Sequence, residues 1–136
     1  MTRIAIMIAA AAAIALATSC SSGGSADDGG TQNPSVDGTK QISTISTADK
    51  TSLCKWFAGL VGGYGSTPAC TMALITAPPS EAECISSFPT CAVPVSTFET
   101  CVRAVVSAQE TCTTQSISMA QTTPECVTVG QAGCFN

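Results

Sequence analysis

The chain contains no histidine, and it has few charged or aromatic residues. Histidine is the usual general base, a common metal ligand and the side chain that titrates near neutral pH, so its absence removes the simplest routes to catalysis and metal binding. Only 10% of the 136 residues are charged and five are basic, which excludes a basic surface for nucleic acid. Aromatic residues make up 4%, too few for a groove that stacks bases or sugars. The composition predicts no cofactor, no metal and no nucleic-acid partner.

Residues 1–19 are predicted to be a lipoprotein signal peptide. Arg3 precedes an uncharged apolar run from Ile4 to Leu16. This run has the length of the hydrophobic region of a signal peptide, roughly 7–15 residues, and it is shorter than the about 20 residues of a spanning helix. The alternative is a buried alanine-rich helix, which the N-terminal position and the leading arginine disfavour.

Cys20 stands apart from the other eight cysteines, which begin at Cys54. The residues ATSC that end at Cys20 resemble the bacterial lipobox, in which small residues precede a cysteine that is acylated and becomes the N-terminus. Ala17 departs from that pattern, which prefers Leu, Val or Ile. Cysteine parity favours lipidation, because eight cysteines pair without remainder once Cys20 carries lipid. The alternative is cleavage at an Ala-x-Ala site after Ala17, which would release a secreted protein.

Residues 20–46 are predicted to be the lipidated cysteine and a flexible linker. From Ser21 to Lys40 the chain is rich in serine, glycine, aspartate and threonine and has almost no apolar side chains. Such a segment buries too little surface to offset the entropy of ordering it. Lipid at Cys20 makes the membrane a partner, and the linker would hold the domain clear of the headgroups. The alternative is a disordered terminus without a role.

Residues 47–136 are predicted to be a cysteine-rich domain held by four disulfides. Eight cysteines in so short a segment are typical of an exported disulfide scaffold. No CxxC pair occurs, although zinc ribbons and thioredoxin-like redox sites use such pairs. The sequence alone does not choose among the possible pairings. The expected disulfide cysteines are Cys54, Cys70, Cys84, Cys91, Cys101, Cys112, Cys126 and Cys134.

The segments between these cysteines have helical patterns. Ser46 and Asp49 have the spacing of a capping box, and Gly62 with Gly63 predicts the end of the helix that follows. Apolar residues between these signals recur on one helical face. They are Leu53, Trp56, Phe57, Leu60 and Val61.

Further helices are expected nearer the C-terminus. Two serine–glutamate pairs, Ser80 with Glu83 and Ser96 with Glu99, predict capping boxes. A helix from Ser96 would carry an apolar stripe. Its members are Phe98, Cys101, Val102, Val105 and Val106. Another short helix is expected from Pro124 to Gly130, and the run from Thr71 to Thr76 is too short to assign to helix or strand. The predicted fold is all-α, a small disulfide-stapled bundle of short helices.

Three features invite a chemical interpretation, and each has a more ordinary one. The Gly62–Thr67 segment, GGYGST, lacks the lysine of a P-loop, so a helix stop and a turn are expected. Glu81 and Glu83 do not face each other on a helix, and they suit the dipole of its first turn. Trp56 and Phe57 have the spacing of core residues. We predict no catalytic residue.

Several segments resemble the small cysteine-rich lipoproteins of myxobacteria. They are CKWF at 54–57, GGYGSTPAC at 62–70, AECISSFPTC at 82–91, VSTFETCVRAVV at 95–106 and TPECVTVGQAGC at 123–134. The resemblance covers roughly Ser46 to Asn136. It implies a secreted or lipid-anchored helical domain held by disulfides, and it transfers no catalytic or binding residue.

The function expected from these features is that of a non-enzymatic envelope lipoprotein, a binding or structural module. Its partners would be the membrane, through Cys20, and an envelope protein or wall component. Ser21 follows the lipidated cysteine, and in Gram-negative systems that this resembles a residue other than aspartate favours the outer membrane. The alternative is a secreted disulfide-rich inhibitor or effector. A small hydrolase is the weakest hypothesis, because no histidine could activate a serine or threonine.

Overall fold

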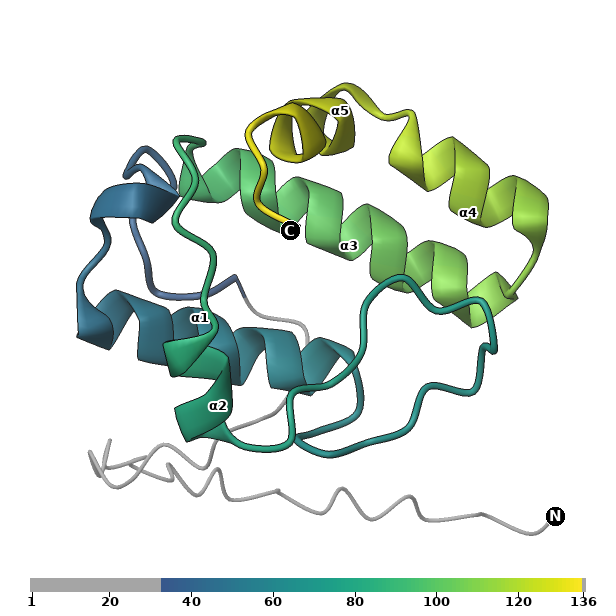
Figure 1. The fold of residues 1–136 in the computed structure, drawn as a ribbon, viewed down its shortest axis with the longest axis horizontal. Helices are drawn as coiled ribbons and strands as arrows, with labels where there is room; N and C mark the ends of the chain where they lie inside the picture. Colours follow the sequence, from purple (N-terminus) through teal and green to yellow (C-terminus); the bar gives the residue numbers. More distant parts are fainter. Residues whose placement is uncertain (1–32, 136) are drawn as a thin grey trace, which may run out of the picture.

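The computed structural model describes residues 33–135, and these residues form five α-helices and one short 3-10 helix (Figure 1). The elements are η1 (Ile42–Thr44), α1 (Thr47–Leu60), α2 (Glu81–Ser86), α3 (Val95–Thr111), α4 (Thr114–Gln121) and α5 (Pro124–Gln131). The predicted all-α class is therefore confirmed. The predicted signal peptide, Cys20 and the first part of the predicted linker lie outside the described residues.

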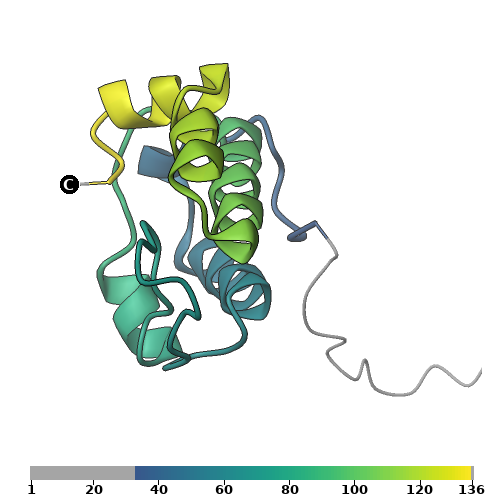
Figure 2. The same cartoon turned by 90° about the vertical axis from the view of Figure 1, so that its right-hand side faces the viewer.

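The long helix α3 lies in the middle of the described domain. On one side it packs against α4 and α5, while α1 packs against α2. Figure 2 shows α4 and α5 on one side of α3, and α1 with α2 on the other. None of the helices in this part of the chain is both long and apolar enough to cross a membrane.

The start and end of α1 follow from local sequence signals. The Ser46 hydroxyl accepts a hydrogen bond from the Asp49 amide, and the Asp49 carboxylate accepts one from the Ser46 amide, which confirms the capping box. After the helix, Gly62 and Gly63 have φ angles of 87° and 104°. Only glycine adopts these angles without strain, so the glycine pair ends α1 as predicted.

The start of α3 differs from the prediction of a Ser96–Glu99 capping box. The helix begins one residue earlier, after Pro94, and no side chain caps it. Its first amides are satisfied by backbone instead: Val95 N donates to the carbonyl of Lys40 at 2.8 Å, and Ser96 N donates to that of Gly38 at 3.0 Å. A segment distant in sequence thus replaces the local cap.

The ordered domain begins earlier than residue 47, where the sequence places its boundary. Ile42 N donates to the Val93 carbonyl at 2.9 Å, and Ser43 N donates to the Cys91 carbonyl at 2.9 Å. Ile42 is 1% exposed and Ile45 8% exposed, so both belong to the core. The second half of the predicted linker therefore packs on the domain, because two isoleucines within a polar stretch bury their side chains.

One helix was not expected from the sequence, and one ambiguous run is neither helix nor strand. α4 begins with a reciprocal capping box between Thr113 and Ser116, and it buries Ile117 and Ala120. The run from Thr71 to Thr76 forms turns and bends. The segment from Cys70 to Pro79 is thus part of the irregular connection from α1 to α2, and it runs past the C-terminal half of α3.

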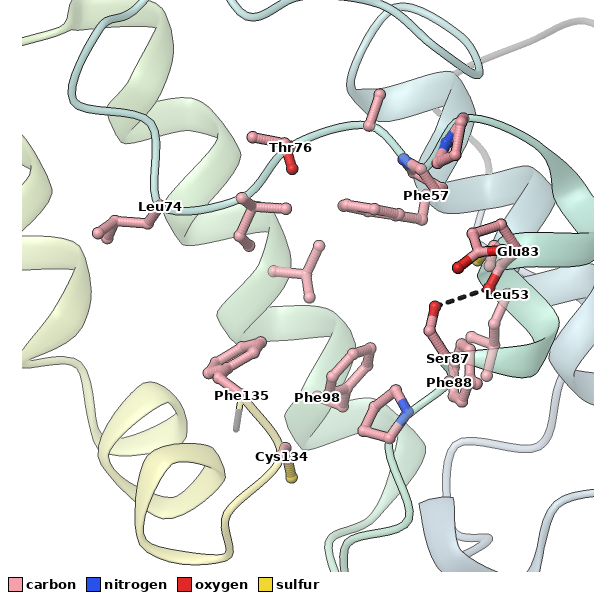
Figure 3. Close-up of a pocket in the computed structure, with 17 residues that line it drawn as sticks. Leu53, Phe57, Leu74, Thr76, Glu83, Ser87, Phe88, Phe98, Cys134 and Phe135 are labelled. Carbon is pink, nitrogen blue, oxygen red and sulfur yellow. Dashed lines mark hydrogen bonds between the residues drawn. The ribbon is translucent and has the colours of Figure 1, made fainter.

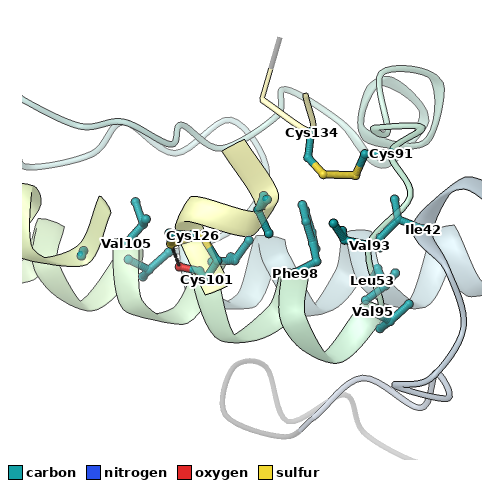
Figure 4. Close-up of a cluster of buried hydrophobic side chains, with 14 of the residues drawn as sticks. Ile42, Leu53, Cys91, Val93, Val95, Phe98, Cys101, Val105, Cys126 and Cys134 are labelled. Carbon is teal, nitrogen blue, oxygen red and sulfur yellow. Dashed lines mark hydrogen bonds between the residues drawn. A yellow bond between two sulfur atoms is a disulfide. The ribbon is translucent and has the colours of Figure 1, made fainter. Parts of the chain in front are cut away.

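The core is built around the apolar stripe of α3, as predicted. All five stripe residues are buried, and they are joined by side chains from η1, α1 and the segment before α3 (Figure 4). Those additional residues include Ile42, Leu53 and Val93, and Val95 at the start of α3 is buried with them; each is at most 2% exposed. Two disulfides, Cys91–Cys134 and Cys101–Cys126, lie within the same cluster. The disulfides therefore stabilise the same core that the apolar side chains form, as expected for a domain too small to have a large core.

Candidate functional site

The eight cysteines from Cys54 onward form four disulfides, as predicted. The pairs are Cys54–Cys84, Cys70–Cys112, Cys91–Cys134 and Cys101–Cys126. Within residues 33–135 there is no cluster of cysteine, aspartate or glutamate side chains that could hold a metal ion. The described cysteines therefore serve the scaffold.

Two of the disulfides join helices that already pack together. Cys54–Cys84 links α1 to α2, and Cys101–Cys126 links α3 to α5. Each pair is buried, with relative exposures of at most 7%. These bridges fix the two helix pairs on either side of the domain.

The other two disulfides fasten irregular segments. Cys70–Cys112 ties the loop that follows α1 to the C-terminal end of α3, and Cys91–Cys134 ties the segment before α3 to the segment after α5. All three irregular segments border the space between the α1–α2 pair and α3. The bridges thus hold the walls of that space.

A cavity of about 420 Å³ occupies this space, and all four phenylalanines of the chain line it (Figure 3). Phe57 comes from α1, Phe98 from α3, and Phe88 and Phe135 from segments that follow α2 and α5. The ring of Phe98 lies 6.0 Å from that of Phe88 and 6.1 Å from that of Phe135, between centroids. The volume and the aromatic lining are typical of small-molecule sites, which range over about 300–1,000 Å³.

The loop from Cys70 to Pro79 forms one wall of the cavity, and Gln109 of α3 holds it. The Gln109 Oε1 atom accepts hydrogen bonds from the amides of Leu74 at 3.0 Å and Ile75 at 2.9 Å. The Gln109 Nε2 atom donates to the Ile75 carbonyl at 3.1 Å. One side-chain amide therefore pairs with the loop backbone as a neighbouring strand would, and it places Leu74 and Ile75 over the cavity.

Polar side chains gather at the α2 edge of the cavity. Glu83 and Ser87 lie one turn apart, and Figure 3 shows their oxygen atoms beside the cavity. The Ser87 hydroxyl donates to the Glu83 carbonyl at 2.7 Å, so its lone pairs remain for a ligand. Glu83 is the one charged residue among the described residues that line this cavity.

A second cavity of about 500 Å³ lies beyond Leu74, Ile75 and Phe135, against α3 and α5. These three residues line both cavities, so the two are neighbours. Leu74 is 47% exposed and Phe135 52% exposed, which leaves an apolar rim between the cavities open to solvent.

The features first considered for chemistry have different positions. Glu83 borders the main cavity, whereas Glu81 is not among its lining residues. Trp56 is buried, as predicted, and the Arg103 guanidinium lies 5.2 Å from its ring centroid. Phe57 was expected in the core, yet it is half-buried and lines the cavity. These positions bring no acid–base pair together in the part of the chain that the structure describes.

Glu99 is a half-buried acidic residue in the second turn of α3. Its Oε1 atom is buried without a hydrogen-bond partner among the described atoms. Burial raises the pKa of the Glu99 carboxyl, and the charge of Arg103 partly opposes that rise. Glu99 is not among the residues that line the main cavity.

Searches of protein-family models, curated proteins and solved structures find no match to this chain. The cavity is the feature that sequence reasoning missed, since its four phenylalanines are scattered from residue 57 to residue 135. Phe88 precedes Cys91 by three residues and Phe135 follows Cys134. The pairing of those cysteines is the signal that would have brought the two rings together.

Proposed function

We propose that this protein is a lipid-anchored protein of the cell envelope whose disulfide-stapled domain binds an apolar ligand and catalyses no reaction. The observation that carries this proposal is the 420 Å³ cavity on which all four phenylalanines converge. A chain with only 4% aromatic residues that places every phenylalanine around one space is organised for binding there.

Exposed apolar surface supports a binding role as well. Isolated exposed apolar residues are common, but Leu74, Val127 and Phe135 are each more than 40% exposed and line the two neighbouring cavities. A contiguous apolar surface with cavities beneath it is typical of a ligand or interaction site.

The polar groups of the main cavity favour binding over catalysis. They are one carboxylate, Glu83, and the hydroxyls of Thr76 and Ser87. The chain has no histidine, the Ser87 hydroxyl donates to a backbone carbonyl, and among the described residues no hydrogen bond joins either hydroxyl to the Glu83 carboxylate, the arrangement that would activate it. These groups can orient a ligand by hydrogen bonding.

The anchor is proposed from the sequence. Cys20 lies in a lipobox-like ATSC, and the eight remaining cysteines satisfy one another in four disulfides. Four buried or half-buried disulfides suit an oxidising compartment outside the cytoplasm. The serine after Cys20 favours the outer membrane.

Intact mass spectrometry of the mature protein tests the anchor. We expect a chain that begins at Cys20, carries acyl groups, and has no free thiol before reduction. Cys20→Ser is the control, and it should remove the acyl mass and shift the protein from the membrane fraction to the soluble fraction. A wild-type mass that corresponds to unmodified protein cleaved after Ala17 would refute the anchor.

A neutral apolar fluorophore, N-phenyl-naphthylamine, tests the binding site. We expect saturable fluorescence enhancement with the full mature chain carrying Cys20→Ser. Ala77→Trp should abolish it, because Ala77 lines the cavity and the indole would fill the space. Ala82→Trp is the matched control, since Ala82 is an exposed residue of α2 outside the cavity lining. Equal binding by both variants would refute this site.

A secreted inhibitor or effector is the second candidate, and the loop from Cys70 to Pro79 favours it. Met72 and Leu74 are 41% and 47% exposed, while Gln109 and the Cys70–Cys112 disulfide hold the loop in place. A held loop with exposed apolar side chains can insert into a partner. Capture from an extracellular fraction that Leu74→Asp abolishes while Ala77→Trp preserves would favour this candidate over cavity binding.

A further inference from the structure

We infer that the main cavity selects a ligand with an apolar body and a positively charged amine at one end. This inference rests on the proposed binding function and specifies its ligand. It follows from the distribution of polar groups around the cavity, from the charge of its lining, and from the shape of its apolar part.

The polar edge of the cavity offers hydrogen-bond acceptors. The ionised Glu83 carboxylate can accept hydrogen bonds but cannot donate them, and the Ser87 hydroxyl already donates its hydrogen to the Glu83 carbonyl. Thr76, on the loop wall of the cavity, adds a hydroxyl that can donate or accept. A ligand group placed beside Glu83 and Ser87 must therefore supply the donors, and an ammonium group supplies three.

The charge of the lining leads to the same ligand class. Glu83 is acidic, and none of the described lysines or the arginine lines the main cavity or its 500 Å³ neighbour. A carboxylate-headed ligand such as a fatty acid would meet a like charge without a cation to offset it. A cationic head would meet the Glu83 carboxylate directly.

The aromatic rings suit the rest of such a ligand. Phe57 and Phe88 lie on the same side of the cavity as Glu83, while Phe98 and Phe135 lie farther from it (Figure 3). The faces of Phe57 and Phe88 can attract the cationic head of the ligand, and Phe98 and Phe135 can pack against its apolar body. The neighbouring cavity beyond Phe135 gives a longer body room to extend.

Three probes with the same body and different heads test the inference: phenylbutylamine, phenylbutanol and phenylbutyrate. Their affinities are measured by ligand-observed NMR titration of the full mature chain carrying Cys20→Ser. This variant has no acyl groups, so it needs no detergent that would compete for the cavity. We expect the amine to bind most tightly and the acid most weakly. Since Glu83 is exposed to water, the difference in affinity between amine and alcohol should be roughly three- to tenfold and should decrease with added salt.

Glu83→Gln should remove this preference. The substitution keeps the size and the acceptor oxygen of the side chain but removes its charge, so amine affinity should fall to that of the alcohol, with the alcohol unchanged. Glu81→Gln is the matched control, because it removes a charge from the same first turn of α2 outside the cavity lining. Glu81→Gln should leave all three affinities within about twofold of wild type, because its charge acts on the ligand only over a longer distance, where solvent and salt screen it.

The outcomes separate this inference from the proposed function. If the alcohol or the acid binds as tightly as the amine, or if Glu83→Gln and Glu81→Gln have equal effects, the amine preference is refuted while the apolar site stands. If none of the three probes binds and the neutral fluorophore also fails, the cavity is not a binding site and the proposed function is refuted with it.

Discussion

At the scale of single residues, Glu99 provides the clearest link between burial and stability. Because burial raises the pKa of its carboxyl, the folded protein holds this proton more tightly than the unfolded chain does. Stability therefore decreases as the pH rises through the folded-state pKa. We expect Glu99→Gln to raise the melting temperature at neutral pH, and the gain to disappear in acid, where Glu99 is protonated in both states. Circular dichroism melts at the two pH values measure this.

The control for Glu99 lies on the same helix. Glu110 is exposed near the end of α3, and Glu110→Gln removes the same charge without removing a buried carboxylate. The melting temperature of this variant should stay close to that of the wild type at both pH values. If Glu99→Gln instead destabilises the protein at neutral pH, the attraction between Glu99 and Arg103 outweighs the cost of burial.

Gln109 is the second residue whose role is open to a direct measurement. Gln109→Leu keeps the bulk of the side chain but removes three hydrogen bonds to Leu74 and Ile75. We expect a loss of about 1–3 kcal/mol in the free energy of unfolding, because the half-buried Ile75 backbone loses its partners. Amide hydrogen exchange at Leu74 and Ile75 should accelerate. Gln115→Leu, at an exposed position on α4, is the control and should leave that exchange unchanged.

At the scale of elements, the difference between α1 and α3 shows what the sequence could predict. The Ser46–Asp49 capping box of α1 was predictable because both partners lie within one turn. The equally good pair Ser96 and Glu99 does not cap α3, since the backbone of residues 38–40 occupies that position. No local pattern records the approach of a distant segment.

The apolar stripe and the cavity show the same distinction. The stripe of α3 was predictable because helical periodicity alone determines which side chains share a face. The cavity needs Phe57, Phe88, Phe98 and Phe135 from four separate segments, and their meeting depends on a disulfide pairing that spacing does not determine. The all-α class and the core face of α3 could therefore be predicted from the sequence, whereas the cavity could not.

At the scale of the whole molecule, two disulfides of similar span should have different functional effects. Cys54 and Cys84 are 30 residues apart, and Cys101 and Cys126 are 25 apart. Replacing either pair with alanines should cost about 2–4 kcal/mol in the free energy of unfolding. Loss of Cys54–Cys84 frees α2, which carries Glu83, and should also weaken fluorophore binding.

Removal of Cys101–Cys126 is the matched control for that experiment. Neither cysteine lines the main cavity, so binding there should persist under conditions in which the domain stays folded. Urea titrations give the stability of each double variant, and the fluorophore titration gives its affinity. Equal loss of affinity in both would show that global stability, and not the position of α2, controls the site.

The start of the ordered domain is the whole-molecule feature on which sequence and structure differ most. Residues 33–135 contain four tryptic sites, at Lys40, Lys50, Lys55 and Arg103. Only Lys40 lies in the predicted linker. The structure holds that residue by its carbonyl, which accepts from Val95 N at 2.8 Å, and by its ammonium, which contacts the Asp49 carboxylate at 2.9 Å.

Trypsin therefore distinguishes a flexible linker that reaches residue 46 from one that ends before the packed segment. A protease needs a locally unfolded stretch, and unfolding around Lys40 would withdraw Ile42 and Ile45 from the core, at roughly 1.5–3 kcal/mol for each side chain. We expect the native protein to resist cleavage after Lys40, and the reduced, unfolded protein to be cut at all four sites. Mass spectrometry of timed digests measures both. Rapid cleavage after Lys40 that leaves residues 41–136 folded would restore the boundary at residue 47.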